Sequence, residues 1–188
     1  MIKALVFIAT GFEEIEAITI IDILRRGNIN VTLAGLTSNP IDGAHKIRIV
    51  PDKSVDEVSA KEFDAIICPG GSPGYTNLRN TIQVIQIIKN AYNLNKLVAA
   101  ICAAPAVLSD AGILQNKNCT IYPGMEKELT KGGGFPKSDN VVVDGNIVTS
   151  KGPATALAFS LKLVEILAGK QVAESVTRKV LANDASKK

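Results

Sequence analysis

Short apolar runs alternate with helix-like segments along the whole chain, and this alternation is the feature that most restricts its fold. Apart from Lys3 and Asp64, the runs Lys3–Ala9 and Phe63–Cys68 are apolar, which indicates strands buried on both faces. Between such runs lie segments with apolar residues at helical spacing, for example Glu14–Arg26. Buried strands separated by helices are typical of a mostly parallel sheet. We therefore predict an α/β fold with helices on both faces of that sheet.

The same patterns predict the remaining elements. Strands are expected at Asn30–Leu36, Ile47–Val50, Leu97–Ile101, Cys119–Tyr122, Val141–Val143 and Ile147–Ser150, and helices at Thr81–Tyr92, Pro105–Ala111, Ala154–Leu167 and Val172–Leu181. Pro51 closes the Ile47–Val50 strand, which places that strand near a sheet edge. No Pro/Gly/Ser-rich linker or internal repeat divides the chain, so residues 1–188 are predicted to form one domain. The polar tail after the last helix is expected to fray.

Charge and cysteine content argue against several classes of protein. The net charge is +3, no run of Lys and Arg forms a basic stripe, and Trp is absent, so nucleic-acid binding is not predicted. The cysteines are odd in number and share no CxxC spacing, which favours a reducing compartment. The apolar start, Met1–Thr10, is too short to span a bilayer and lacks a cleavage site. We expect a cytoplasmic protein that does not bind membranes.

Cys102 is the strongest candidate for a reactive side chain. It follows the predicted strand Leu97–Ile101 and precedes a helix that begins near Pro105. In parallel sheets, ligands bind beyond such carboxyl strand ends. Ala100 and Ala104 supply the small side chains that a tight nucleophile turn requires two residues before and after the nucleophile. The nearby helix N-terminus favours a thiolate, whereas a buried structural cysteine is the alternative interpretation.

The other cysteines and the only histidine carry no comparable signal. Cys68 and Cys119 lie inside apolar runs and are expected in the core. His45 stands among polar residues before a strand, so we expect it to be exposed rather than catalytic. With one histidine and no His/Cys cluster, no metal site is predicted. A Cys-His-Asp protease would have to recruit His45.

Three acidic residues lie at the first strand-to-helix junction, within Gly11–Glu16. Carboxylates are favoured near a helix N-terminus, and this explains Glu13 and Glu14. Glu16 lies two positions further along the chain, between Ile15 and Ala17. It either follows the same helix-end pattern or points back toward the strand ends, where it would be buried, protonated and hydrogen-bonded to the Cys102 thiolate. The residues alone leave both alternatives open.

Two glycine-containing loops follow other predicted strands. The Pro69–Gly74 loop offers backbone N–H groups that suit a phosphate or an oxyanion, with an ordinary turn as the alternative. It lacks the Lys-Ser/Thr pair of a P-loop, and no G-x-G-x-x-G follows the first strand. Gly152 and Pro153 follow the Ile147–Ser150 strand. We predict that the protein uses no nucleotide or other cofactor.

Taken in order, these motifs resemble the DJ-one (ThiJ/PfpI) superfamily, in the branch of the parkinsonism-associated protein deglycase and its bacterial relatives. The resemblance covers nearly the whole chain and is carried by KALVFIATGFEEIE, DILRRGNINVTLAG, FDAIICPGG, LVAAICAAP, IYP, VVVDGNIVTSKGPATA and LKLVEILAGK. A short piece such as PGG is common, but the ordered set with AAICA and the acid at Glu16 is specific. The resemblance implies a flavodoxin-like three-layer sandwich and a homodimer.

The resemblance also implies a set of site residues. Cys102 would be the nucleophile, prone to oxidation to sulfinate, and a protonated Glu16 would stabilise its anion. Gly70, Gly71 and Ala103 would supply backbone amides, and Tyr122, Gly152 and Pro153 would contact the substrate. The implied function is a cofactor-independent glyoxalase or deglycase that acts on methylglyoxal-type α-oxoaldehydes or glycated protein. A redox-sensing or chaperone-like stress protein that uses the same oxidisable cysteine is the alternative.

Two positions depart from the pattern of the superfamily. The protease-like branch has histidine directly after the nucleophile, where this chain has Ala103, so peptidase activity is not predicted. Several members have histidine before a proline near the cysteine, where this chain has Tyr122 before Pro123. Tyrosine donates hydrogen bonds but is a poor base near neutral pH. Proton transfer therefore falls to Glu16 or to the substrate.

Overall fold

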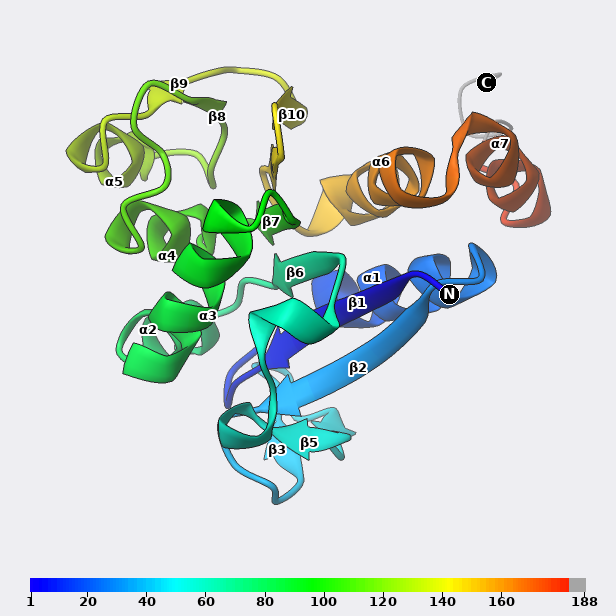
Figure 1. Ribbon diagram of the computed structural model, residues 1–188, viewed down its shortest axis with the longest axis horizontal. Helices are drawn as coiled ribbons and strands as arrows, with labels where there is room; N and C mark the ends of the chain where they lie inside the picture. The colour runs from blue at the N-terminus through cyan, green and yellow to red at the C-terminus, as the bar shows by residue number, and fades with distance from the viewer. Residues whose placement is uncertain (183–188) are drawn as a thin grey trace.

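A seven-stranded sheet forms the centre of the computed structural model, which describes residues 1–182 (Figure 1). In spatial order its strands are β10 (Val141–Asp144), β11 (Ile147–Ser150), β7 (Leu97–Ile101), β6 (Ala65–Cys68), β1 (Lys3–Ile8), β2 (Asn30–Gly35) and β5 (Lys53–Ser54). Neighbouring strands are parallel except for β10, which pairs antiparallel with β11 through the turn at Gly145. The predicted mostly parallel sheet is confirmed.

Helices cover both faces of this sheet. On one side lie α1 (Glu14–Arg26), α6 (Ala156–Ala168) and α7 (Lys170–Lys179), and on the other lie α2 (Gly74–Arg79), α3 (Ile82–Asn93), α4 (Pro105–Asp110) and α5 (Glu126–Lys131). The side chains of β1 alternate between two cores. Val6 and Ile8 pack with α1 and α6, whereas Leu5 and Phe7 pack with α3 and α4. The result is the predicted flavodoxin-like three-layer α/β fold.

Two predicted strands are placed differently in the structure. The expected edge strand Ile47–Val50 is reduced to β4 (Arg48–Ile49), which pairs with β3 (Ile41–Asp42) in a separate hairpin, while β5 forms the sheet edge. Of the expected strand Cys119–Tyr122, only Asn118–Cys119 is extended, as β8 beside β9 (Phe135–Pro136). The backbone after Cys119 bonds instead to groups at the ends of the main strands. Tertiary contacts thus override the local strand pattern.

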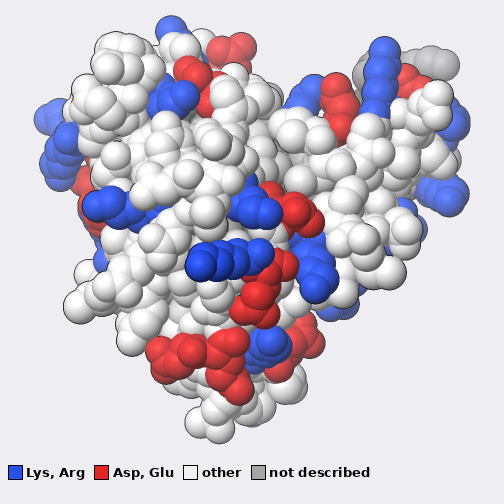
Figure 2. Space-filling view, viewed as in Figure 1, with Lys and Arg blue, Asp and Glu red and all other residues white. Residues whose placement is uncertain are grey.

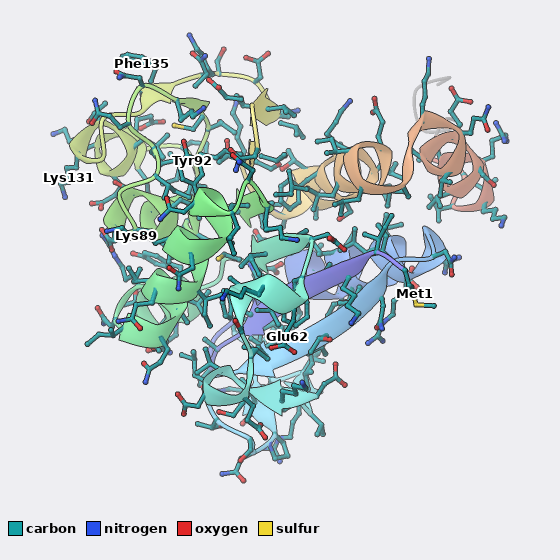
Figure 3. All side chains as sticks on the ribbon, viewed as in Figure 1. Met1, Glu62, Lys89, Tyr92, Lys131 and Phe135 are labelled. Atoms are coloured by element: carbon teal, nitrogen blue, oxygen red, sulfur yellow. The ribbon has the colours of Figure 1, made fainter. Side chains whose placement is uncertain are left out.

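Side chains fill the space between the helical layers and the sheet, while Lys89 of α3 and Lys131 of α5 are exposed (Figure 3). Positive and negative side chains are intermingled on the face seen in Figure 2. None of the helices formed by residues 1–182 is long and apolar enough to cross a membrane. The predicted fraying of the tail falls mainly on residues 183–188, which lie outside the described residues.

The topology brings four loops to one edge of the sheet. Strands β11, β7, β6 and β1 are consecutive parallel neighbours, so their carboxyl ends lie side by side. The loops that follow them are those identified from the sequence around Glu13, Gly70, Cys102 and Gly152. This edge is where open α/β sheets bind ligands.

Candidate active site

Cys102 occupies a strained turn between β7 and α4. Its φ angle is +63°, in the left-handed region that non-glycine residues rarely adopt. Its N–H donates to the Ser150 carbonyl at 2.9 Å, and its own carbonyl accepts from the Tyr122 N–H at 2.8 Å. Ala100 and Ala104 are fully buried on either side. The turn is therefore fixed on two sides, and 9% of the residue remains exposed.

Glu16 points from the first turn of α1 toward this edge of the sheet, and it is fully buried. Its Oε2 atom accepts a hydrogen bond from the Gly70 N–H at 2.8 Å. Its own N–H donates to Oε2 of Glu13, the residue that caps the helix, at 2.8 Å. Its Oε1 atom is buried without a hydrogen-bond partner among residues 1–182. The Glu16 carboxyl is thus buried and points back toward the strand ends, as the second alternative from the sequence placed it; its protonation state stays a prediction.

Glu16 and Cys102 are electrostatically coupled. Burial raises the pKa of Glu16 to about 7, the Glu13 charge acts in the same direction, and hydrogen bonds with Gly70 and Cys102 oppose the rise. Burial also raises the pKa of Cys102 to about 12, the nearby Glu16 adds to this rise, and backbone N–H groups of Ala103 and Gly71 oppose it. Beside an ionised Glu16, these effects favour the protonated Cys102 thiol over the predicted thiolate.

Gly70 allows these two side chains to approach each other. A Cβ at this position would lie 2.6 Å from Cβ of Cys102 and 2.8 Å from Oε2 of Glu16, which is too close for either contact. The Gly70 N–H is donated to Glu16, so the expectation that it serves the cysteine is wrong. The N–H groups of Gly71 and Ala103 are the ones that favour the ionised Cys102. Gly70 therefore positions Glu16 beside the thiol.

Replacing Gly70 with alanine tests this close approach. We expect Gly70→Ala to displace the Cys102 and Glu16 side chains and to lower turnover by about 10²-fold, since displacements near 1 Å have such effects. Gly112→Ala is the control for steric crowding, because its Cβ would meet no atom within 4 Å; its φ of +71° makes it a stringent control, since Gly70 carries no such left-handed strain. Kinetics and thermal unfolding of both variants are compared. A Gly70→Ala protein with full activity would contradict the assignment.

The other predicted contacts border Cys102. The Tyr122 ring lies against Gly152, where a Cβ would be 3.5 Å from the ring atom Cδ2. Pro153 begins the short 3₁₀ helix that follows. The Thr155 hydroxyl holds this turn, because it accepts from the Gly152 N–H at 3.1 Å and donates to the Gly152 carbonyl at 2.8 Å. Sequence reasoning missed Thr155, although a hydroxyl residue soon after a strand end is a signal for such a turn.

Cys68 and Cys119 are buried in the core, as predicted. Burial raises the pKa of Cys68 far above its usual range. Burial also raises the pKa of Cys119 to about 11, with a further contribution from the Asp144 charge. All three cysteines are buried, but Cys102 retains 9% exposure whereas Cys68 and Cys119 have none, so Cys102 is the most accessible of the three.

His45 is exposed, as predicted, and it has a structural partner that the sequence did not reveal. Its backbone N–H and its Nδ1 atom contact the buried Glu14 carboxylate at 2.6 and 2.9 Å. Burial opposes ionisation of Glu14, but these hydrogen bonds outweigh it and lower the pKa. Possible metal-ligand atoms of Glu13, Glu14 and His45 lie within 4.8 Å of one another. Both carboxylates already accept backbone N–H groups, so this cluster ties the β3–β4 hairpin to the start of α1.

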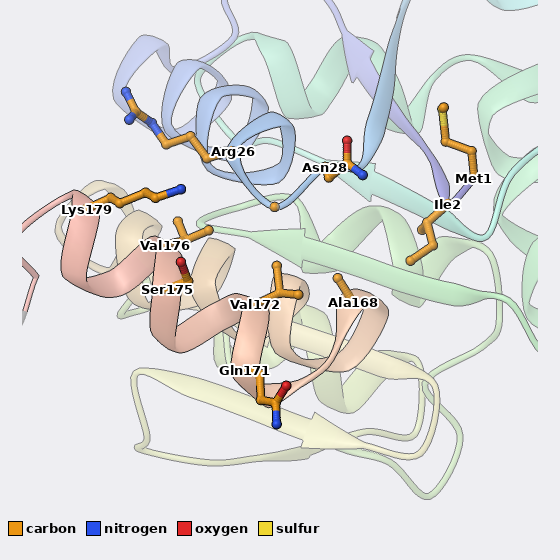
Figure 4. A pocket seen from close by; sticks show the side chains of 11 residues that line it. Met1, Ile2, Arg26, Asn28, Ala168, Gln171, Val172, Ser175, Val176 and Lys179 are labelled. Atoms are coloured by element: carbon orange, nitrogen blue, oxygen red, sulfur yellow. The ribbon is translucent and has the colours of Figure 1, made fainter.

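A large groove of about 670 Å³ lies elsewhere (Figure 4). It is lined by Met1, Ile2, Arg26, Gly27, Asn28, Ala168, Gln171, Val172, Ser175, Val176 and Lys179. Met1 and Ile2 precede β1, so the groove is at the amino-terminal end of the strands, opposite the Cys102 edge. None of the candidate site residues lines it. We assign the chemistry to the Cys102 edge because the coupled side chains are there.

Comparisons with known proteins identify relatives over nearly the whole chain. The chain is 38% identical to protein dj-1beta of Drosophila melanogaster over 180 residues, which cover 95% of this chain and 96% of the relative. It is 39% identical, over 166 residues and 88% of each chain, to a Caenorhabditis elegans protein named glutathione-independent glyoxalase DJR-1.2.

Solved structures agree as well. The crystal structure of Drosophila DJ-1beta has a TM-score of 0.91 at 38% identity and covers 96% of this chain and 97% of that one. Oxidized Toxoplasma gondii DJ-1 has a TM-score of 0.89 at 35% identity, with 96% and 98% covered. The family model matches residues 2–166. This agreement in sequence and fold shows that the chain belongs to the DJ-1/PfpI family.

Proposed function

We propose that this protein is a cysteine-dependent, cofactor-independent glyoxalase that converts α-oxoaldehydes such as methylglyoxal into α-hydroxy acids. The observation that carries the proposal is the buried Glu16 carboxyl, with a pKa of about 7, held beside the partly exposed Cys102 thiol. A group with this pKa can both accept and return a proton at neutral pH. The name of the C. elegans relative, a glutathione-independent glyoxalase, supports the same reaction class.

The first step forms a covalent adduct. The Cys102 sulfur adds to the aldehyde carbon while ionised Glu16 takes the thiol proton, and that proton then passes to the former aldehyde oxygen to give a hemithioacetal. Negative charge on this oxygen is transient. The N–H groups of Ala103 and Gly71, which favour negative charge on Cys102, are placed to stabilise it. The high pKa of the thiol thus makes its activation dependent on Glu16.

The second step moves hydrogen between two carbons. Glu16 takes the proton from the hemithioacetal carbon, and the electron pair of that C–H bond forms an enediol as the adjacent carbonyl oxygen gains a proton. Glu16 then returns its proton to the former carbonyl carbon while the hydroxyl on the sulfur-bearing carbon loses its proton, which gives the thioester of the α-hydroxy acid. Water then hydrolyses the thioester, releasing the acid and restoring the Cys102 thiol. The net reaction adds one water to methylglyoxal and gives lactate.

Lactate formation tests the proposal directly. Purified protein is mixed with methylglyoxal in the absence of glutathione, and lactate and remaining aldehyde are both quantified. We expect many equivalents of lactate per protein, with saturable kinetics. Aldehyde loss that stops at one equivalent, without lactate, would show adduct formation only and would contradict a glyoxalase. Action on glycated protein is the finer form of the proposal, and the same assay with a glycated peptide tests it.

A second proposed function is redox sensing by the same thiol, and differential exposure favours it. Cys102 is 9% exposed, whereas Cys68 and Cys119 are fully buried. We expect mild peroxide to oxidise Cys102 first, to sulfenate and then to sulfinate. Peptide mass spectrometry after a brief treatment locates the added oxygen. Earlier oxidation of either buried cysteine would contradict this function.

Homodimerisation also remains a proposal. Ile15 and Ile18 of α1 are 58% and 44% exposed, so this helix presents apolar surface away from the sheet. Exposed apolar patches are common at protein interfaces. Light scattering of the purified protein measures the oligomeric state.

A further inference from the structure

The Tyr122 side chain is half exposed and lies beside a glycine. Tyr122 is 49% exposed. A Cβ on Gly152 would lie 3.5 Å from Cδ2 and 3.8 Å from Cε2 of the ring, which are ordinary contact distances. Because Gly152 has no side chain, the ring borders the space that a larger residue would fill. The exposed part of the ring is available to a ligand.

Both parts of this contact are held in place. The Tyr122 N–H donates to the Cys102 carbonyl at 2.8 Å, and two residues earlier the Thr120 N–H donates to the Thr149 hydroxyl at 2.8 Å. Gly152 is fixed by its two hydrogen bonds with the Thr155 hydroxyl. An aromatic side chain with a fixed base loses little conformational freedom when it binds a ligand. The ring and Gly152 form a preorganised wall.

This wall borders the nucleophile. Tyr122 is bonded directly to the Cys102 backbone, and Gly152 lies two residues after Ser150, which accepts the Cys102 N–H. The other neighbours of the thiol, Glu16 and Gly70, are buried. An aldehyde carbon bonded to the sulfur therefore leaves the rest of its molecule on the solvent side. Tyr122 is the half-exposed residue whose backbone is bonded to this turn.

We infer that Tyr122 is a specificity-determining residue that favours α-oxoaldehydes with an aromatic substituent over methylglyoxal. The inference rests on the proposed function, because it assigns a substrate class to the same site. Aromatic groups gain from contact with another ring beyond the apolar area they bury. The methyl group of methylglyoxal is too small to cover the exposed part of the ring.

Competition between two aldehydes tests the inference. The kcat/KM values for phenylglyoxal and methylglyoxal are measured for the unmodified protein and for Tyr122→Ala, Tyr122→Phe and Tyr92→Ala. The ratio of the two values, compared between variants, cancels the different intrinsic reactivities of the aldehydes. We expect Tyr122→Ala to lower the phenylglyoxal-to-methylglyoxal ratio by roughly fivefold or more, while Tyr122→Phe retains it. Tyr92→Ala removes a half-buried tyrosine of α3 and should leave the ratio unchanged.

The outcomes separate this inference from the proposed function. If Tyr122→Ala turns over both aldehydes with the same kcat/KM ratio as the unmodified protein, the specificity role is overturned and the glyoxalase proposal is unaffected. If Tyr122→Phe and Tyr122→Ala lower the phenylglyoxal-to-methylglyoxal ratio equally, the selectivity comes from the hydroxyl group. That result also overturns the role of the aromatic ring. Absence of turnover of either aldehyde by the unmodified protein contradicts the proposed function itself. Thermal unfolding of each variant confirms that it is folded.

Discussion

Cys102→Ser is expected to abolish glutathione-independent lactate formation, lowering kcat/KM by about 10³-fold or more. Serine preserves the size of the side chain and its place at the strained turn. Its hydroxyl, however, is far less acidic than a thiol, and Glu16 with a pKa of about 7 is too weak a base to activate it. The measurement is lactate release at substrate concentrations from below to above KM.

Cys119→Ala is the matched control for this variant. Cys119 is buried in the α3/α4 core and lies outside the Cys102 edge, so its replacement should leave turnover nearly unchanged. Thermal unfolding shows whether either variant has lost structure. A folded Cys102→Ser protein with undiminished turnover would exclude a covalent mechanism through this residue.

Glu16→Gln is expected to lower turnover by about 10²- to 10⁴-fold, the usual contribution of a general acid–base group. Glutamine can still accept the Gly70 N–H but cannot take the thiol proton. The unmodified protein needs ionised Glu16, so its kcat/KM should rise with pH up to about 7 and then level off. Residual activity of Glu16→Gln should lack that rise. An unchanged rate and pH profile would remove Glu16 from the mechanism.

The same variant has a stability readout. Burial raises the pKa of Glu16 from 4.5 to about 7, so the folded state binds this proton more tightly than the unfolded chain. The stability contributed by the protonated carboxyl is complete below pH 4.5 and is lost as pH rises through about 7. The loss is about 3 kcal/mol. The unmodified protein should therefore lose stability relative to Glu16→Gln as pH rises between these values, because the variant has no carboxyl to ionise. Denaturant unfolding of both proteins at several pH values measures the difference between their free energies of unfolding.

Much of the architecture could be predicted because it depends on local pattern. Continuous apolar runs such as Phe63–Cys68 indicate buried parallel strands, and such strands bring their following loops to one edge. Cys102 was identifiable because its small neighbours Ala100 and Ala104 are adjacent in sequence. The β3–β4 hairpin was not, because it is held by Glu14, which contacts His45 from a distant part of the chain.

The electrostatics of the site could not be predicted from the residues. The helix N-terminus after Cys102 suggested a low thiol pKa, but burial and Glu16 act in the opposite direction and prevail. Burial depends on the complete packing of both layers, which no local motif encodes. The role of Gly70 was also hidden, since it follows from the convergence of Glu16 and Cys102 on one point in space. Both the raised pKa of Cys102 and the close approach at Gly70 depend on distances between segments that are far apart in the sequence.

The shortness of β5 has a consequence for aggregation. This strand closes one edge of the main sheet with only Lys53 and Ser54, and the first of these carries a charge. Exposed backbone groups at a sheet edge are templates on which another chain can add a strand and begin aggregation. A two-residue charged edge offers little such template. This edge of the sheet is thus a poor site for edge-to-edge association with another chain.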